Sequence, residues 1–322
     1  MKRLFVHAFA VAALGFGGAL FAAENYPTRP VRLVVPFAAG GTATINARMV
    51  ANQVEKQIGQ PIVVDNRPGA NGIIGIQLVA NAAPDGHTML YTTTSIAINP
   101  SVYKNLPYDM FRDLAPVTII ALGEGYVLLT APASPLKSVK DVIARAKQGK
   151  LSFGSAGVGN STHLVAETFA KEAGIKMVHV PYKGVAPAMN AVMGGEVNVM
   201  FIPPTAVLGH IQAGRLRALG FTGKSRWSHL PDVPTVSEAG VPGFYNSSGF
   251  NAWFTTAKTP ISIRVKMQQE IHKALQVPGV KDVFVKGAYQ PLGNSPQEAE
   301  AFLRQQVKEF AEVVRAAGVE QN

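Results

Sequence analysis

Short strand-like runs alternate with amphipathic segments along most of the 322-residue chain, and this alternation constrains the fold more than any other feature. Val31–Val35 has the composition of a buried strand, and Thr44–Ile58 follows it with apolar residues on one helical face. Further strands are predicted at Pro61–Val64 and Thr88–Thr92, on either side of a helix at Ile73–Ala82. This order predicts a mainly parallel sheet with helices on its faces and ligands at the carboxyl ends of its strands.

A second series of the same kind begins after Gly123. We expect its strands at Tyr126–Thr130, Leu151–Gly154, Met177–Pro181, Val197–Phe201 and Leu216–Phe221, and its helices at Val139–Gln148, Ser161–Ala173 and Ala186–Gly194. A loop-rich stretch over residues 225–248 then leads to a strand at Asn251–Thr256 and to three amphipathic helices, the last at Pro296–Ala317.

Two α/β domains fit these two series better than one long sheet. We predict that they are joined by two crossover segments, near Gly123 and near Gly249, with the ligand cleft between them. Residues 24–124 and 250–322 then form a first, discontinuous domain, and residues 125–249 form the second.

The N-terminal segment has the pattern of an export signal. A basic head, Met1–Arg3, precedes a run from Leu4 to Ala23 that only His7 interrupts with a polar side chain. We predict a signal peptide over residues 1–23, cleaved after Ala22 or Ala23, and a periplasmic mature protein. An uncleaved membrane anchor is the alternative, because about 20 apolar residues can span a bilayer.

Composition excludes several kinds of chemistry. The chain has no cysteine, which removes thiol catalysis, iron–sulfur clusters and Cys-ligated zinc. Its seven histidines show no paired metal-ligand spacing, so we expect no metal and no cofactor. The formal charge of +10 falls to +8 without the signal peptide (28 basic against 20 acidic residues), and these charges are scattered. A small anionic ligand fits this charge better than a nucleic acid does.

Two glycine-rich loops, each between a strand and a helix, are the most informative local features. The first covers residues 36–44, where Thr42 or Thr44 can cap the helix that follows. The second covers residues 155–163, where Asn160, Ser161 and Thr162 supply side-chain donors. Free N–H groups at the start of a helix bind anions, although each loop alone could be only a tight turn.

Enzyme motifs are weaker than these loops. Gly157-Val158-Gly159 lacks the third glycine of a dinucleotide fingerprint, and Gly223-Lys224-Ser225 lacks the first glycine of a phosphate loop. Ser161 and His163 share a loop but belong to no nucleophile elbow. We therefore expect no catalytic residues and no enzyme, with a secreted hydrolase using Ser161 and His163 as the alternative.

Many short motifs in fixed order resemble those of the Bug-type solute receptors of tripartite tricarboxylate transporters. The resemblance runs from Tyr26 to about Ala317 and rests on Tyr26-Pro27-Thr28-Arg29-Pro30, Val35-Pro36-Phe37 with Gly40-Gly41, Asp65-Asn66-Arg67-Pro68-Gly69-Ala70, Ala83-Pro84-Asp85-Gly86, Asn99-Pro100, Leu106-Pro107-Tyr108-Asp109, His179-Val180-Pro181-Tyr182-Lys183-Gly184 and Leu230-Pro231-Asp232-Val233-Pro234-Thr235. It implies a type II periplasmic binding-protein fold that closes on an organic carboxylate, and a two-component membrane permease as partner. We expect a monomer.

The resemblance also implies the ligand-binding residues. One wall of the cleft would hold Phe37, Ala39, Gly40, Gly41, Thr42 and Thr44, with Thr94 and Ser95 beside them. The opposite wall would hold Ser155, Gly157, Asn160, Ser161, His163, Ile202 and Pro203, with Tyr182 and Lys183 near the cleft. Lys183 could equally be an ordinary surface lysine.

Two departures from the family pattern bear on the ligand. Thr44 and the run Ile202-Pro203-Pro204 stand where the family often has acidic residues. Without those acids, the pocket favours an apolar body or a second carboxylate over an ammonium group. We therefore predict a dicarboxylate with one carboxylate on each glycine-rich loop. An aromatic diacid similar to terephthalate is one candidate, and an aliphatic diacid is the alternative. A ligand-sensing receptor for a signalling system is the alternative role.

Overall fold

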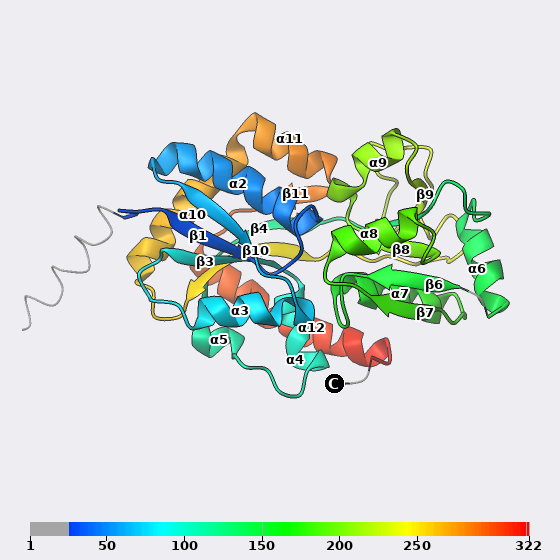
Figure 1. Ribbon diagram of the computed structural model, residues 1–322, viewed down its shortest axis with the longest axis horizontal. Coiled ribbons are helices and arrows are strands. Elements are labelled where there is room, and N and C mark those ends of the chain that lie inside the picture. Colours follow the sequence, from blue (N-terminus) through cyan, green and yellow to red (C-terminus); the bar gives the residue numbers. More distant parts are fainter. Residues whose placement is uncertain (1–25, 150, 320, 322) are drawn as a thin grey trace, which may run out of the picture.

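The computed structural model describes residues 26–149, 151–319 and 321 and contains two mixed α/β sheets, which lie in two lobes (Figure 1). The predicted signal peptide lies outside these residues. The chain passes between the lobes twice, after Gly123 and near Gly249, where the Gly123 N–H donates to the Gly249 carbonyl oxygen at 2.7 Å. We call the lobe that carries the first sheet lobe 1 and the other lobe 2.

Lobe 1 is built on a six-stranded sheet in the order β11-β4-β10-β3-β1-β2. Its strands are β1 (Val31–Val35), β2 (Ile62–Asn66), β3 (Thr88–Thr93), β4 (Leu114–Gly123), β10 (Phe250–Thr256) and β11 (Tyr289–Pro291). The β1–β2 and β1–β3 pairs are parallel, whereas β10 pairs antiparallel with β3 and β4, and β11 pairs antiparallel with β4.

Lobe 2 is built on a five-stranded sheet in the order β7-β6-β8-β5-β9. Its strands are β5 (Val127–Thr130), β6 (Ser152–Ser155), β7 (Val178–Pro181), β8 (Val199–Ile202) and β9 (Arg217–Phe221). The pairs of β6 are parallel and those of β5 are antiparallel. The expectation of mainly parallel sheets is therefore wrong, because β10 and β5 run opposite to their neighbours where they follow the two crossings.

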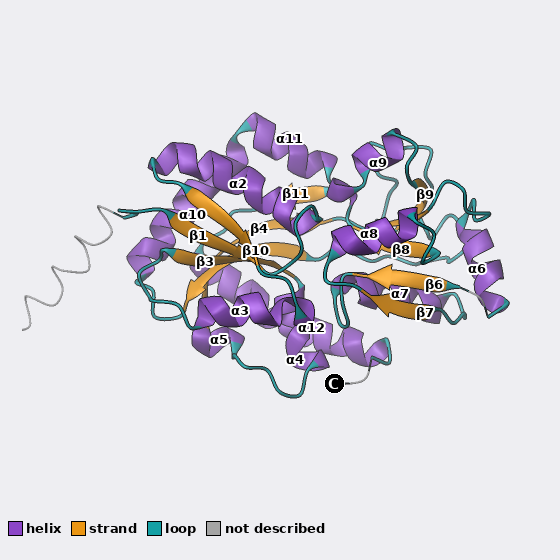
Figure 2. Ribbon diagram, viewed as in Figure 1, coloured by secondary structure: helices purple, strands orange, loops and turns teal. Residues whose placement is uncertain are grey.

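Helices cover both faces of each sheet (Figure 2). In lobe 1 they are α2 (Thr42–Ile58), α10 (Ile261–Gln276) and α11 (Pro278–Lys286) on one face, and α3 (Ile73–Ala80), α4 (Ser95–Val102) and α12 (Pro296–Ala316) on the other, with α5 (Met110–Asp113) and the 3₁₀ turn η1 (Ala70–Gly72) nearby. In lobe 2 they are α6 (Val139–Lys147), α7 (Ser161–Glu172), α8 (Val185–Met193), α9 (Leu208–Gln212) and the 3₁₀ turn η2 (Pro204–Ala206).

Local sequence explains where several helices begin. Ser295 caps α12 in a reciprocal capping box with Glu298, and Pro296 occupies the first turn. Ser138 caps α6 through the Asp141 N–H. The predicted helices and strands agree with the structure to within a few residues, but β4, β11, α4, α5 and α9 were not predicted. The β4 strand is buried along almost its whole length and so shows no alternation of apolar and polar residues.

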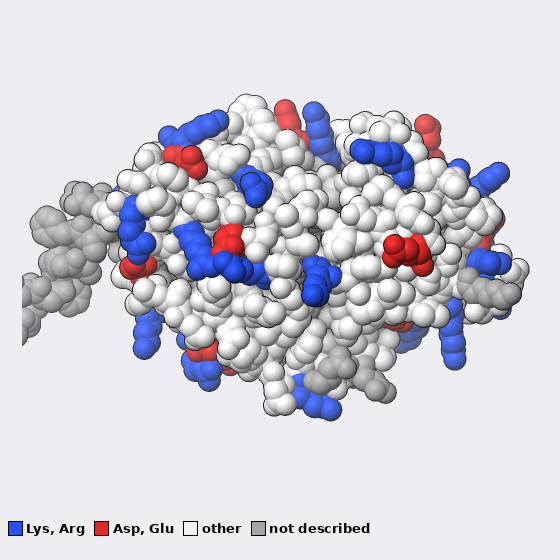
Figure 3. Space-filling model, viewed as in Figure 1, with Lys and Arg blue, Asp and Glu red and all other residues white. Residues whose placement is uncertain are grey.

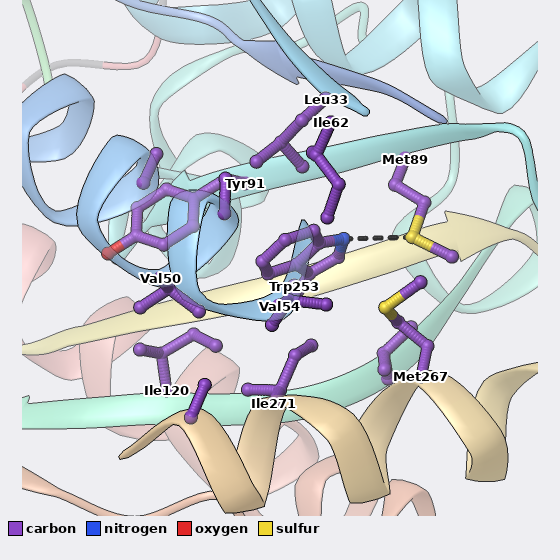
Figure 4. Packing of buried hydrophobic residues seen from close by; sticks show 14 of the residues in the cluster. Leu33, Val50, Val54, Ile62, Met89, Tyr91, Ile120, Trp253, Met267 and Ile271 are labelled. Atoms are coloured by element: carbon purple, nitrogen blue, oxygen red, sulfur yellow. Dashed lines mark hydrogen bonds between the residues drawn. The ribbon is translucent and has the colours of Figure 1, made fainter. Parts of the chain in front are cut away.

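The core of lobe 1 surrounds Trp253 of β10, which is fully buried (Figure 4). Its indole N–H contacts the Met89 sulfur at 3.0 Å, and its ring meets Tyr91 edge-on. Figure 4 shows Ile271 and Met267 of α10 facing this cluster from one side. Burial of these side chains fixes α2 and α10 against the sheet, and α2 in turn carries the first glycine-rich loop.

Charges on the outside are mixed in sign. Figure 3 shows lysine and arginine side chains spread over the face in view, with acidic side chains among them. Asp65 accepts hydrogen bonds from Arg32 and Arg67, and these partners lower the pKa of its carboxyl against the effect of burial. Among the described residues, no helix is both long and apolar enough to cross a membrane.

Two isoleucines of α10 give a matched test of this core. Ile271 is fully buried and Ile261 is 56% exposed. We expect Ile271→Ala to lower the free energy of unfolding by about 2–5 kcal/mol, because the deletion leaves a cavity. Ile261→Ala, the same chemical change on the surface, should alter it by less than about 0.5 kcal/mol. Urea unfolding followed by circular dichroism measures both, and equal losses would contradict the placement of α10.

Candidate ligand-binding cleft

A cavity lies between the lobes, with the N-terminal ends of α2 and α7 on opposite sides of it. Most of its wall is apolar or carries neutral hydroxyl groups. The lining residues are Phe37, Gly41, Thr42, Ala43, Thr93, Ala156, Asn160, Ser161, Thr162, Val185, Pro203, Ser248, Phe250 and Tyr289. The cavity leaves about 40 Å³ free, space for only a few water molecules.

The start of α2 leaves several backbone donors free. None of the N–H groups of residues 39–43 donates a hydrogen bond within the described part of the chain. Gly41, Thr42 and Ala43 are buried and line the cavity. The Thr42 hydroxyl also has no hydrogen-bond partner among the described residues. Buried donors of this kind need an acceptor, and the positive end of the helix favours an anionic one.

Thr44 supports this loop from behind. The Asn66 side-chain amide donates to the Phe37 carbonyl oxygen and to the Thr44 hydroxyl, both at 2.8 Å, and the Thr44 hydroxyl donates to the Ala38 carbonyl oxygen at 3.3 Å. The expectation that Thr42 or Thr44 caps α2 is wrong. The N-cap is Gly41, which has no capping side chain, and this leaves the helix end open to the cavity.

The second glycine-rich loop is built in the opposite way, because most of its amides have internal partners. Asn160 caps α7 and accepts from the Thr162 N–H at 3.0 Å. The N–H groups of Ala156, Gly157 and Gly159 donate to Thr162, Ser155 and His163 respectively. Only the N–H groups of Val158 and Ser161 remain free among residues 156–163, and Ser161 lines the cavity.

A stack of aromatic rings lies beneath this loop. The His163 and His179 rings are parallel, 3.8 Å apart between centroids, and His179 stacks on Phe153. His163 accepts the Gly159 N–H at Nδ1, so its proton is at Nε2, which faces Glu167 at 3.4 Å. Burial, together with the neighbouring His163, lowers the pKa of His179 to about 3, and its Nε2 contacts the Ser155 hydroxyl at 2.6 Å. The stack therefore fixes the loop rather than acting on a ligand.

Tyr289 lines the cavity, and Tyr126 lines a neighbouring pocket that also contains Ser161. Burial raises the pKa of Tyr289 to about 12, and the polar side chains of Asn251 and Ser248 beside it act in the opposite direction. Burial also raises the pKa of Tyr126, with Ser161 acting against it. Both phenols are therefore neutral at ordinary pH and can donate to an anion.

Six of the predicted binding residues line the cavity: Phe37, Gly41, Thr42, Asn160, Ser161 and Pro203. Gly157, Tyr182 and Lys183 line a separate groove at the mouth between the lobes, and Lys183 is exposed there. The remaining predicted residues lie outside the cavity wall: Ala39, Gly40, Thr44, Thr94, Ser95, Ser155, His163 and Ile202. Of these, Thr94 donates to the Phe250 carbonyl oxygen and accepts the Phe250 N–H, so it holds β10 beside the crossing.

Several lining residues were missed from the sequence, above all Thr93, Ser248, Phe250 and Tyr289. Ser248 and Phe250 flank the crossing near Gly249, which the sequence located without marking these side chains. Tyr289 begins β11, a strand of three residues. No local pattern distinguishes such a short strand, and only the fold brings it to the cavity.

The chemistry of the cavity is that of a neutral anion site. None of its lining residues is Asp, Glu, Lys, Arg or His. No group of three or more His, Cys, Asp or Glu side chains able to hold a metal ion occurs among the described residues. Ser161 has no hydrogen bond to His163, whose two ring nitrogens face Gly159 and Glu167, so the geometry provides no activated nucleophile for the hydrolase alternative.

Comparisons with known proteins show the family of the chain. The model of the tripartite tricarboxylate transporter family receptor matches residues 46–319. The chain belongs to this family. It is also similar to the periplasmic binding protein BugD, at 32% identity and a TM-score of 0.87, with 92% of this chain and 100% of that one covered. The resemblance to Bug-type receptors and the predicted fold class are thereby confirmed.

Two structures with ligands are also similar. One is R. palustris Rpa4515 with adipate, at 31% identity and a TM-score of 0.87 over 92% of this chain and 100% of that one. The other is MatC from Rhodopseudomonas palustris with bound malate, at 26% identity and a TM-score of 0.81 over 90% and 100%. The family and these neighbours are solute-binding proteins, so this member of the family is a receptor and not an enzyme.

The depressed pKa of His179 makes a prediction about acid stability. Below its ordinary pKa of 6.5, the unfolded chain takes up a proton at this residue that the folded chain does not bind until near pH 3. The free energy of unfolding should therefore fall more steeply between pH 6.5 and 3 in the wild type than in His179→Gln. The difference in slope corresponds to the uptake of at most one additional proton on unfolding. Urea unfolding at a series of pH values measures the two slopes, and parallel curves would contradict the neutral state of His179.

Proposed function

We propose that the protein is an exported periplasmic receptor that captures a dicarboxylate with an apolar body and delivers it to a tripartite tricarboxylate-type permease. The observation that carries this proposal is the open N-terminal end of α2, where buried N–H groups and the Thr42 hydroxyl face a cavity that has no charged lining residue. Such a site selects an anion and offers nothing to balance an ammonium group.

One carboxylate of the ligand sits at the N-terminal end of α2. There it accepts hydrogen bonds from the N–H groups of Gly41, Thr42 and Ala43 without an arginine clamp. The other carboxylate lies toward α7, where the Ser161 N–H and hydroxyl are available, with the phenol of Tyr289 nearby. The α2 end therefore offers the ligand more hydrogen-bond donors than the α7 end, and we assign the stronger carboxylate binding to the α2 end.

The body of the ligand is apolar. Phe37, Val185, Pro203 and Phe250 line the space between the two polar ends. A hydroxylated chain would lose hydrogen bonds to water against these side chains without regaining them. Adipate and malate, with which two relatives were solved, differ in this respect, and we favour a ligand of the adipate or terephthalate type.

Capture requires the lobes to move. The proposed moving bodies are residues 24–124 with 250–322 and residues 125–249, joined by the crossings near Gly123 and Gly249. A ligand that bridges both helix ends stabilises the closed arrangement through its greater affinity for that arrangement. The closed form is then the one that the permease recognises.

Thermal unfolding of the mature chain, residues 24–322, tests the ligand class. The panel consists of terephthalate, adipate, malate, benzoate and glutamate. At about a hundred times the dissociation constant, a bound ligand adds about 2.7 kcal/mol to stability. We expect a rise with terephthalate or adipate that exceeds the rise with malate or benzoate, and none with glutamate. A response confined to glutamate would refute the proposal.

Thr44 provides a test of the electrostatics. In Thr44→Asp, Asn66 can still donate to the new side chain, but a negative charge now lies directly behind the free N–H groups of α2. We expect the affinity for the dicarboxylate to fall at least about tenfold, because like charges repel strongly near a buried site. Thr44→Asn, which is neutral and similar in size, should cost less than about threefold.

Isothermal titration calorimetry measures both affinities, and circular dichroism checks that both variants fold. Equal losses in the two variants would show that Thr44 acts through packing alone.

A further inference from the structure

A buried hydrogen-bond chain crosses between the lobes at Asn71 and Asn160. The Asn160 side-chain amide donates to the Asn71 side-chain oxygen at 3.0 Å. Asn71 in turn donates to the Asn99 side-chain oxygen at 2.9 Å, and Asn99 donates to the Tyr108 hydroxyl at 3.0 Å. These four residues are at most 6% exposed.

The direction of every amide in this chain is determined by its neighbours. Asn160 uses its side-chain oxygen to accept the N–H and the hydroxyl of Thr162, both at 3.0 Å, as the N-cap of α7. Its side-chain NH₂ must then face lobe 1, where only an acceptor can meet it. Asn71 supplies that acceptor and needs its own NH₂ for Asn99. Because Asn160 caps α7 with its side-chain oxygen, the residue of lobe 1 that meets its NH₂ group must offer a hydrogen-bond acceptor.

The backbone at Asn71 is specialised for this position. Its φ and ψ of 49° and 36° lie in the left-handed region, and Ala70 beside it has φ 44°. Asparagine tolerates this conformation better than other residues with a side chain, except aspartate. An asparagine is thus the residue that combines the left-handed backbone with both a side-chain donor and a side-chain acceptor.

We infer that Asn71 is a positioning residue that holds the two lobes together and aligns the N-terminal end of α7 opposite that of α2. Opening the lobes separates Asn71 from the cap of α7, and closing them restores the bond. Two further contacts cross the same mouth: the Tyr103 hydroxyl donates to the Val158 carbonyl oxygen at 3.1 Å, and the Ala38 N–H donates to the Lys183 carbonyl oxygen at 3.4 Å. The inference rests on the proposed hinge motion, but it does not depend on which ligand binds.

The absence of cysteine allows a direct measurement of closure. Gln77 in lobe 1 and Lys176 in lobe 2 are both exposed. In the variant Gln77→Cys/Lys176→Cys, spin labels report the distance between the lobes by pulsed electron resonance without added ligand. Hydrogen exchange of the segment that contains Ala38 gives a second measure, because its N–H bond to Lys183 exists only when the lobes meet.

Asn71→Gly keeps the left-handed backbone and removes the side chain. We expect it to lower the ratio of short to long distances between the two spin labels about fivefold. Hydrogen exchange of the segment that contains Ala38 should become faster by a similar factor. Ala70→Gly is the matched control, since it adds a glycine to the same turn without touching the bond between the lobes, and it should change neither measure. Thermal unfolding checks that both variants fold.

A double-mutant cycle then tests the pairing. Asn160→Asp keeps the cap of α7 but replaces the donor that faces Asn71 with an acceptor. Its effect on closure should be smaller in the Asn71→Gly chain than in the parent chain. Three results would each overturn the inference. Asn71→Gly could keep the wild-type label distances and exchange rate, Ala70→Gly could change them equally, or the effects in the cycle could be fully additive. None of these outcomes bears on the ligand panel, so the two proposals fail separately.

Discussion

A helix begins with backbone N–H groups that no residue of the same helix can accept, and the two helices that face the cleft meet this constraint in different ways. In α7, the Asn160 side chain accepts the Thr162 N–H, and the amides of the loop before the helix mostly have partners of their own. In α2, Gly41 has no capping side chain, and the first donors open onto the cavity. One helix end is thereby a rigid structural element, while the other is a site whose hydrogen bonds a ligand can complete.

This asymmetry links the site to the fold around it. The α2 loop is held from behind by Asn66 and Thr44, and α2 itself is held by the core around Trp253. The α7 loop is held by the stack of His163 and His179 and by the bond from Asn160 to Asn71. Both loops therefore sit on well-packed elements, so the proposed motion of one lobe against the other would leave each loop intact.

Local patterns predicted much of the fold and part of the site. Periodicity located α2, α7 and most strands to within a few residues, because each buries one face against a sheet. It missed β4, which is buried on both faces, and α4, which contains Pro100. It also gave the wrong balance of parallel and antiparallel pairs, because strand direction after a crossing depends on partners far away in the chain. Thr42 and Ser161 were found because they lie in glycine-rich loops, and Phe37 through the family resemblance, whereas Ser248 and Tyr289 reach the cavity only through the fold.

The sequence by itself determined the alternation of strands and helices, the two loops that begin α2 and α7, and the lack of acidic residues at Thr44 and Ile202. These features depend on residues close together in the chain, where propensity and spacing act directly. Only the tertiary structure decided which loop keeps its N–H groups free, and it also paired Asn71 with Asn160 across 89 positions. The physical reason is that a donor is free or satisfied according to what lies beside it in space, and sequence distance does not determine that.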